Sequence, residues 1–332
     1  RGIDIKIIPF SIVKKLPPGL RHIVFFFYVF FNAIGKDIVF AQDVFSVGLP
    51  ALCVAKILNK PFFVRVPGDF AWEQSRQRFG VTDSVDDFQK KKYGWIVEFY
   101  RKAEHFVVKH ADVVLAPSVY FANLVSLWMK KGRAVPVYNG INFEYIESIV
   151  AGEKKQSENF TIISAGRMVP WKEFAGLIEV VSKQKSWNLI LVGDGPEKEK
   201  LVNLVRDKQV GDRVQFISSL PQEELWKTIA RSGVFVLNSS FESFSYQVVE
   251  AMAVGTPVVA TNGCNLDEII TNGEEGILIP VKDSNSLEKA IIKISQNELL
   301  VEKITQKAKI KAEKFSIDQT LNKLIVMLQS KI

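Results

Sequence analysis

Short runs of β-branched, aliphatic and aromatic residues alternate with longer amphipathic stretches along the whole chain. This alternation predicts α/β architecture, in which parallel strands are covered by helices on both faces. The strands predicted in the first half are 3–8, 37–42, 62–66, 112–117 and 134–138. Those predicted in the second half are 160–166, 188–195, 213–217, 234–239, 256–261 and 276–280.

The stretch 139–159 breaks this rhythm, because turn residues are followed there by a polar, charged run. We therefore expect two Rossmann-like, doubly wound domains, 1–145 and 146–315, facing each other across a cleft where ligands of such folds bind. The last segment, 316–332, has apolar residues at helical spacing, which predicts a helix that docks back on the N-terminal domain: Leu321, Leu324, Ile325 and Leu328.

The most apolar run, "IVFFFYVFF" at 23–31, is far shorter than the ~20 residues of a membrane-spanning helix. It predicts a helix that is buried or lies at an interface, and we favour burial. No secretory signal pattern opens the chain. Residues 3–8 enter directly as a predicted strand with no element before it, so we expect an upstream part to be missing.

The composition, 47% hydrophobic and 24% charged over 332 residues, is that of a globular protein. Two cysteines cannot build a disulfide framework, and neither they nor the three histidines have metal-ligand spacing, so we expect a reducing, cytoplasmic location and no metal site. Residues 1–150 hold 20 Lys and Arg against 13 Asp and Glu, whereas 151–332 hold 23 of each. The basic half suits an anionic membrane surface or a phosphorylated acceptor, or is simply a solvated face; no nucleic-acid motif accompanies it.

The segment "FESFSYQVVEAMAVGTPVVAT" (241–261) places Glu242 and Glu250 eight positions apart. A helix that starts near Ser245 and ends at Gly255 would point its first amides and positive dipole end at a phosphate. Carboxylates only accept hydrogen bonds, so beside a phosphate they suit the hydroxyls of a sugar and a ribose.

Two further strand-to-helix turns carry candidate ligand contacts. Arg167 and Lys172 lie on one turn, where two cations can grip a diphosphate; a pair of ordinary surface cations is the alternative. Gly193 and Gly195 lie on the next, where missing side chains let backbone approach a ligand, or where the chain simply turns tightly. Neither a G-x-G-x-x-G nor a G-x-x-x-x-G-K-[ST] pattern is present.

The segments "AGRMVPWK", "VGDGP" and "FESFSYQVVEAMAVGTPVVAT", in this order and spacing, resemble the nucleotide-sugar domain of family 4 retaining glycosyltransferases of the GT-B fold. The resemblance covers roughly 130–290 closely, and "FFVRVPGDFAWE" (62–73) resembles an acceptor-side loop. It implies a retaining transfer of a sugar from a nucleoside-diphosphate sugar to a glycan or lipid-linked acceptor, without metal or other cofactor.

The same resemblance implies roles for individual residues. Arg167 and Lys172 would hold the donor diphosphate, and Glu250 would bind the ribose hydroxyls. Glu242 would face the donor sugar, while the amides of Phe244 and Ser245 would cap the distal phosphate.

Two departures from the family pattern bear on function. Asp69 stands near a position where many relatives have histidine, and it either contacts the sugar or acceptor or caps a turn. In the family that the chain resembles, a first strand and glycine-rich loop precede a segment like 1–8, and their expected loss here leaves open a donor-binding subunit without turnover. A nucleotide-sugar epimerase of the same fold is the other alternative to the transferase. We expect a cytoplasmic protein, with peripheral binding at the inner face of the cell membrane as one option that the basic half suggests.

Overall fold

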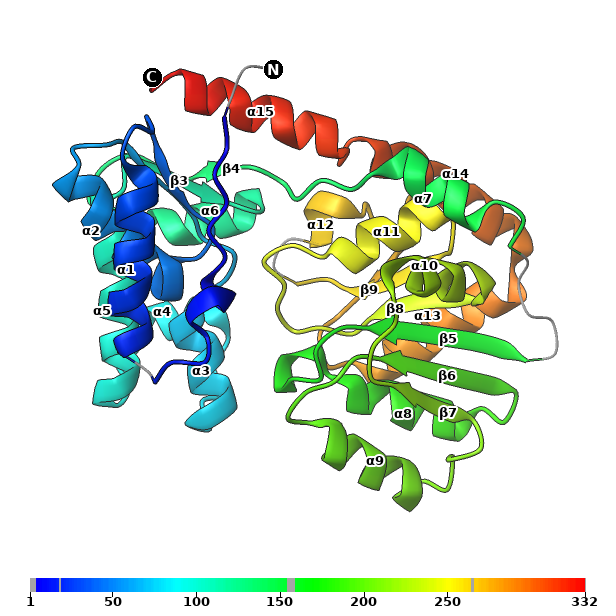
Figure 1. Ribbon diagram of the computed structural model, residues 1–332. Helices are drawn as coiled ribbons and strands as arrows, with labels where there is room; N and C mark the ends of the chain where they lie inside the picture. The colour runs from blue at the N-terminus through cyan, green and yellow to red at the C-terminus, as the bar shows by residue number, and fades with distance from the viewer. Residues whose placement is uncertain (1–3, 18, 154–158, 264–265, 332) are drawn as a thin grey trace. The chain divides into compact units, whose positions relative to one another are not determined.

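A computed structural model describes residues 4–17, 19–153, 159–263 and 266–331 (Figure 1). The chain forms two compact units, each with its own parallel sheet. Unit 1 comprises 1–138 together with 322–332, and unit 2 comprises 139–321. The α/β architecture predicted from the alternating pattern is confirmed.

Unit 1 is built on a four-stranded sheet in the order β1-β2-β3-β4. Its strands are β1 (Val39–Ala41), β2 (Phe62–Arg65), β3 (Val113–Ala116) and β4 (Val135–Pro136). Its helical segments are η1 (Phe10–Val13), α1 (Leu20–Ala33), η2 (Val44–Gly48), α2 (Leu49–Ile57), α3 (Phe70–Arg78), α4 (Val85–Lys90), α5 (Trp95–His110) and α6 (Val119–Ser126).

Unit 2 is built on a six-stranded sheet in the order β10-β9-β8-β5-β6-β7, with every pair parallel. Its strands are β5 (Phe160–Ala165), β6 (Trp187–Val192), β7 (Val214–Ile217), β8 (Val234–Leu237), β9 (Val258–Thr261) and β10 (Ile277–Ile279). Its helical segments are α7 (Phe143–Val150), η3 (Pro170–Lys172), α8 (Phe174–Lys183), α9 (Lys198–Asp207), α10 (Gln222–Arg231), α11 (Tyr246–Val254), α12 (Leu266–Ile269), α13 (Ser284–Gln296) and α14 (Glu298–Glu313). The last helix, α15 (Ile317–Gln329), begins in unit 2, and its residues from Asn322 onward belong to unit 1.

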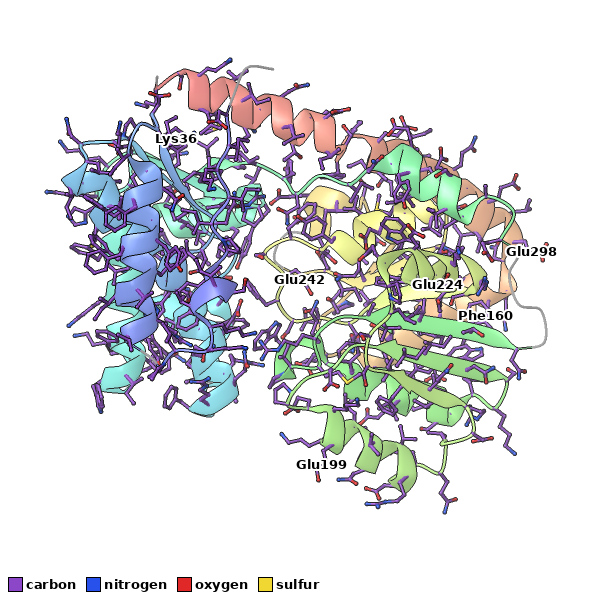
Figure 2. All side chains as sticks on the ribbon, viewed as in Figure 1. Lys36, Phe160, Glu199, Glu224, Glu242 and Glu298 are labelled. Atoms are coloured by element: carbon purple, nitrogen blue, oxygen red, sulfur yellow. The ribbon has the colours of Figure 1, made fainter. Side chains whose placement is uncertain are left out.

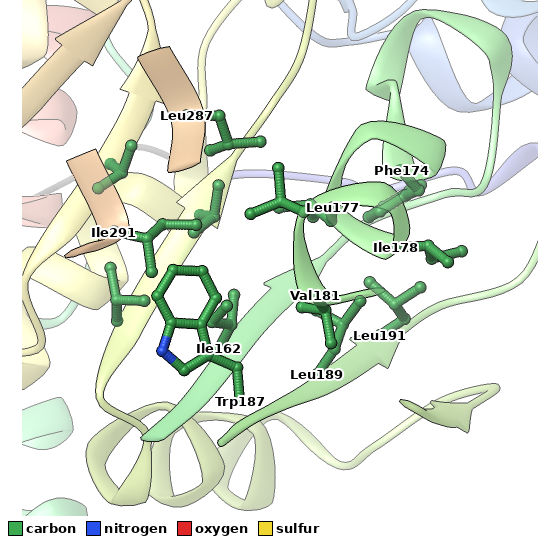
Figure 3. Close-up of a cluster of buried hydrophobic side chains, with 14 of the residues drawn as sticks. Ile162, Phe174, Leu177, Ile178, Val181, Trp187, Leu189, Leu191, Leu287 and Ile291 are labelled. Atoms are coloured by element: carbon green, nitrogen blue, oxygen red, sulfur yellow. The ribbon is translucent and has the colours of Figure 1, made fainter. Parts of the chain in front are cut away.

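The core of unit 2 lies between its sheet and the helices α8 and α13 (Figure 3). Leu177, Ile178 and Val181 of α8 are all fully buried, at the three- and four-residue spacing that keeps one helix face against a sheet. They pack in one cluster with Ile162 of β5 and Leu189 of β6. Burial of these side chains fixes the strand ends, and therefore the loops that follow them.

The strand order of unit 2 reverses between β5 and β8. From β5 the chain adds β6 and β7 on one side, and it then returns to add β8, β9 and β10 on the other. In open parallel sheets the loops after two such strands diverge and leave room for a ligand at their carboxyl ends. A ligand of this sheet would therefore meet the residues that follow β5 and β8.

The strands predicted from 37 onward are all confirmed, with ends within three residues of those observed. The predicted strand at 3–8 is wrong over its described part, since residues 4–9 form no strand. Ile5 and Ile7 have the alternation of a strand, but both are exposed, and β1 pairs with β2 alone among the described strands. An alternating pattern becomes a strand only where a neighbour accepts its hydrogen bonds.

The apolar run 23–31 is helical, as predicted, within α1. Burial of the whole run is wrong, because only Phe25 and Val29 of these residues are buried. A helix that is apolar on every side and packs by one face must expose the other. Among the described residues, no helix has both the length and the hydropathy needed to span a membrane.

Candidate functional site

The loop after β5 carries both predicted cations. Arg167 is exposed, and it forms no ion pair with any residue that the structure describes. Lys172 ends the short helix η3, and only 11% of its side chain is exposed. One cation is thus open to solvent, and the other is held close to the protein.

The loop after β8 carries Glu242, which Figure 2 labels. Its Oε1 accepts a hydrogen bond from Lys172 Nζ at 2.5 Å, and its side chain is likewise 11% exposed. The two loops are also tied through their backbones, because Ser240 N donates to Trp171 O at 2.7 Å. Adjacent strands therefore bring together residues that stand 70 positions apart, as the sequence prediction of one ligand site requires.

The helix after Glu242 has the ends that were predicted. It is α11, whose N-cap is Ser245, with its hydroxyl accepting from Val248 N at 3.4 Å. It ends at Gly255, which has φ 85° and whose N–H donates to Ala251 O. Phe244 and Ser245 are both buried at this helix end, and the predicted contact of their amides with a phosphate remains a prediction.

Glu250 lies inside α11 and is only 8% exposed. Its Oε1 accepts from Gln222 Nε2, at the start of α10, at 2.8 Å. Burial raises the pKa of Glu250 to about 7, against the opposing effect of the donors beside it. The indole of Trp226 is one such neighbour, although its N–H makes no hydrogen bond of ordinary geometry among the described residues. Glu250 is thus a carboxyl group whose charge state changes near neutral pH.

Gly193 and Gly195 lie after β6 and pack on the loop that follows β5. A Cβ at Gly193 would stand 2.0 Å from Gly166 O, and one at Gly195 would stand 2.4 Å from Met168 O. Both positions therefore require glycine because backbone packs there on the loop that carries Arg167. The sequence left open whether the two glycines approach a ligand or only allow a tight turn. The structure shows the tight turn with its close backbone contact, and the donor contact of the two glycines remains a prediction.

Asp69 belongs to unit 1, where it is the N-cap of α3. It accepts from Trp72 N and from Gln89 Nε2, both at 2.8 Å, and it is 2% exposed. Burial raises its pKa to about 6. The neighbouring carboxyl of Glu104 accepts from Phe70 N and Ala71 N, and burial together with Asp69 raises its pKa well above the ordinary range. The structure thus displays the capping alternative for Asp69, and its predicted contact with a sugar or acceptor remains a prediction.

Sequence reasoning missed two members of these clusters. Gln222 was not singled out, because a polar residue at the start of a helix carries no sequence signal that links it to Glu250. Glu104 was also missed, since a lone glutamate on an amphipathic helix is indistinguishable in sequence from a solvated one. Among the described residues, no three His, Cys, Asp or Glu side chains are grouped so as to hold a metal ion.

A hollow of about 450 Å³ also lies in unit 2, at the amino ends of β5 and β6. It is lined by Asn159, Phe160, Gln184, Ser186, Trp187, Ile292, Ser295 and Gln296. None of these side chains is titratable near neutral pH. The hollow therefore offers no charged side chain to a ligand, whereas the carboxyl edge of the same sheet offers Arg167, Lys172, Glu242 and Glu250.

Two curated relatives match with about 30% identity. A lipopolysaccharide core biosynthesis glycosyltransferase, LpsE of Rhizobium meliloti, is 32% identical over 44% of this chain and 42% of its own length. The N-acetyl-alpha-D-glucosaminyl L-malate synthase of Bacillus anthracis is 30% identical over 61% of this chain and 55% of its own length. This chain therefore matches about half of the length of these curated relatives.

Solved structures share the fold. HepE of Anabaena, in complex with UDP, superposes with a TM-score of 0.75 and 18% identity over 92% of this chain and 82% of HepE. Sucrose-phosphate synthase of Thermosynechococcus elongatus gives a TM-score of 0.74 and 19% identity over 96% of this chain and 81% of that protein. The two Rossmann-like domains of the GT-B fold, implied by the sequence resemblance, are confirmed.

The family match covers the unit that carries the candidate site. Residues 146–311 match the family described as glycosyl transferases group 1, and they include Arg167, Lys172, Glu242 and Glu250. That span is half of the chain. The chain belongs to the glycosyl transferases group 1 family.

Proposed function

We propose that this protein is a retaining glycosyltransferase that moves a sugar from a nucleoside diphosphate to a sugar or lipid-linked glycan acceptor. The observation that carries the proposal is the joining of Lys172 and Glu242 at the reversal point of the unit 2 sheet, 2.5 Å apart. Family membership supports it, and so do the UDP and UDP-glucose bound to HepE, which shares the fold.

The two cations have the chemistry to hold the donor diphosphate. Exposed Arg167 offers a planar fork of donors, and Lys172 offers a point charge. The N-terminus of α11 adds backbone amides and the positive end of its dipole, and we assign the distal phosphate to the amides of Phe244 and Ser245. Together these groups stabilise the negative charge that develops on the leaving phosphate.

The two carboxylates have the chemistry to bind hydroxyls. We assign the donor sugar to Glu242, because the ion pair with Lys172 holds its carboxylate beside the diphosphate position. We assign the ribose diol to Glu250, because one of its oxygens already accepts from Gln222 and the carboxylate needs further donors in a buried setting.

The proposed reaction is a substitution on one face of the donor sugar. The bond from the anomeric carbon to the diphosphate oxygen breaks, and a bond to the acceptor oxygen forms on the same face. The acceptor's proton passes to the departing phosphate oxygen, so no paired carboxylates acting as acid and nucleophile are needed. Because Arg167, Lys172 and the helix end supply positive charge, we expect turnover to continue after a chelator is added; loss of turnover that magnesium restores would contradict this.

Calorimetric titration with UDP, GDP, ADP and dTDP tests the donor site. We expect one nucleotide to bind selectively, and Glu250→Gln to weaken that binding about tenfold or more, since a hydrogen bond to a charged group contributes about 1.5–3 kcal/mol. Glu302→Gln is the matched control, because Glu302 is exposed on α14 in the same unit. Equal affinity of wild type and Glu250→Gln would overturn the assignment.

Product identification tests the reaction itself. Incubation of the selected nucleotide sugar with a panel of glycan and lipid-linked acceptors should give a glycoside of unchanged anomeric configuration. Interconversion of the donor without an acceptor would indicate an epimerase instead. Binding without any turnover across the panel would indicate a donor-binding subunit.

A further inference from the structure

Three helices of unit 1 form one layer whose outer surface is unusually apolar. Helix α2 packs against both α1 and α5 (Figure 1). Right-handed crossovers between successive parallel strands place α2 and α5 on the same side of the sheet. We call the outward residues of this layer the aromatic-basic face: Ile23, Phe27, Phe31, Lys56, Ile57, Trp95, Phe99, Lys102, Phe106 and Lys109.

Helix α5 presents an aromatic stripe to solvent. Trp95, Phe99 and Phe106 are 80%, 58% and 48% exposed, and their spacing of four and seven residues places them on one side of the helix. Val97, Val107 and other residues on the opposite side are buried. Exposed aromatic side chains do not gain the free energy of burial unless an apolar partner or a lipid phase covers them.

Helix α1 extends the apolar surface. Phe31 is 67% exposed, and Ile23 and Phe27 lie at preceding turns of the same exposed side. An apolar hollow of about 380 Å³, lined by Phe79, Val81 and residues 93–97, adjoins Trp95 at the start of α5. Large exposed apolar side chains gathered on neighbouring helices are typical of an interaction site rather than of ordinary solvated surface.

Among the described residues, the exposed, unpaired charges on the same helices are positive. Lys56, Lys102 and Lys109 are exposed, while α1 and α2 contain no aspartate or glutamate. The two glutamates of α5 are engaged elsewhere: Glu98 pairs with Arg101 at 2.9 Å, and Glu104 is buried against the start of α3. The aromatic-basic face therefore combines apolar area with uncompensated positive charge.

We propose that the aromatic-basic face binds the surface of a lipid bilayer that contains anionic headgroups. Helices that lie in a bilayer interface carry Trp and Phe on the apolar side and Lys on the polar side, and each Lys near an anionic surface strengthens binding. The aromatic rings would sit at headgroup level, and the lysines would contact phosphates. The proposal stands apart from the transferase proposal, because it uses no residue of the donor site.

A second copy of the chain is the competing occupant of the face. In a two-fold dimer the same patch meets itself, so lysines of one copy would face lysines of the other. Lysine is also depleted in the buried core of protein interfaces. The charge on the face thus favours an anionic surface over self-association.

Vesicle co-sedimentation tests the proposal directly. The purified chain is mixed with vesicles of phosphatidylcholine alone, or of phosphatidylcholine with phosphatidylglycerol. We expect sedimentation with the anionic vesicles only, and weaker binding at high salt because exposed charges are screened. Absence of binding to the anionic vesicles would overturn the proposal.

Two variants separate the apolar and the charged contributions. Trp95→Ala/Phe99→Ala and Lys102→Glu/Lys109→Glu should each lower the partition coefficient about tenfold or more. The matched controls lie on unit 2: Leu299→Ala for an exposed apolar residue, and Lys293→Glu/Lys303→Glu for exposed lysines. Equal losses in variants and controls would overturn the proposal, as would a wild-type dimer that the aromatic variant converts to monomer. Calorimetric nucleotide affinity should be unchanged in all four, which keeps this test separate from that of the donor site.

Discussion

The proposed binding of ribose by Glu250 needs an ionised carboxylate, but the buried position of Glu250 disfavours the charged form. Burial raises its pKa to about 7 from the ordinary 4.5, so between these pH values the unfolded chain carries a charge that the folded protein does not. Folding therefore takes up a proton in that window, and the group lowers stability progressively as pH rises from about 4.5 to about 7.

The Glu250→Gln variant should consequently be more stable than the wild type at neutral pH. The gain has an upper limit of about 3 kcal/mol, at about 1.4 kcal/mol for each pKa unit, and it should be larger at pH 8 than at pH 5. Urea denaturation at the two pH values measures it. A difference in unfolding free energy that does not change with pH would show that burial does not set the charge of Glu250.

Gln222 is predicted to position the carboxylate of Glu250 for the ribose. Gln222→Leu removes the donor at 2.8 Å, so the pKa of Glu250 should rise further. Nucleotide affinity at neutral pH should then fall about tenfold and recover as pH is raised, because the ionised carboxylate returns. Calorimetric titration across pH measures both effects.

The control for this variant is Gln184→Leu. Gln184 Nε2 donates to Glu288 Oε1 at 2.9 Å, which is a similar contact remote from the carboxyl edge of the sheet. The Gln184→Leu substitution should leave nucleotide affinity and the pH profile of that affinity unchanged. A purely structural role for Gln222 would lower stability without moving the pH profile.

At the scale of elements, the loops after β5 and β6 pack directly against each other through backbone atoms. Met168 N donates to Asp194 O at 2.9 Å, and Gly193 faces Gly166 with no room for a Cβ. Gly193→Ala should therefore destabilise unit 2 by about 2 kcal/mol or more, as overpacking and a strained positive φ both act against it.

Gly211→Ala provides the matched comparison, because nothing lies within 4 Å of the position where its Cβ would be. It should be neutral or slightly stabilising, since alanine restricts the unfolded chain more than glycine does. Urea denaturation of the two variants gives the difference. Equal stability of both variants would mean that the loop after β5 yields to the added methyl group.

Most strands and the ends of α11 could be predicted, because local pattern and capping residues determine them. Ser245 and Gly255 are residue types that start and stop helices whatever surrounds them. The strand at 3–8 failed because pairing depends on a partner distant in sequence. The close packing of Gly193 on Gly166 and the bond from Gln222 to Glu250 are likewise tertiary, and no spacing in the sequence encodes them.

At the scale of the whole molecule, the chain divides its chemistry between two units with separate sheets and cores. Every residue proposed above to contact the donor lies in unit 2. The positive excess lies in 1–150, most of which belongs to unit 1. A ligand that binds one unit stabilises that unit by mass action and leaves the other unchanged.

Scanning calorimetry of the whole chain should therefore resolve two unfolding transitions, of which the selected nucleotide raises only one. At a nucleotide concentration of about 100 times Kd the stabilisation is about 2.7 kcal/mol. Gly193→Ala identifies the responsive transition as that of unit 2, because it should lower the same one. A tenfold loss of affinity in Glu250→Gln should reduce the nucleotide stabilisation to about half. A single transition would mean that the two units unfold together. An equal rise of both transitions would mean that donor binding stabilises both units.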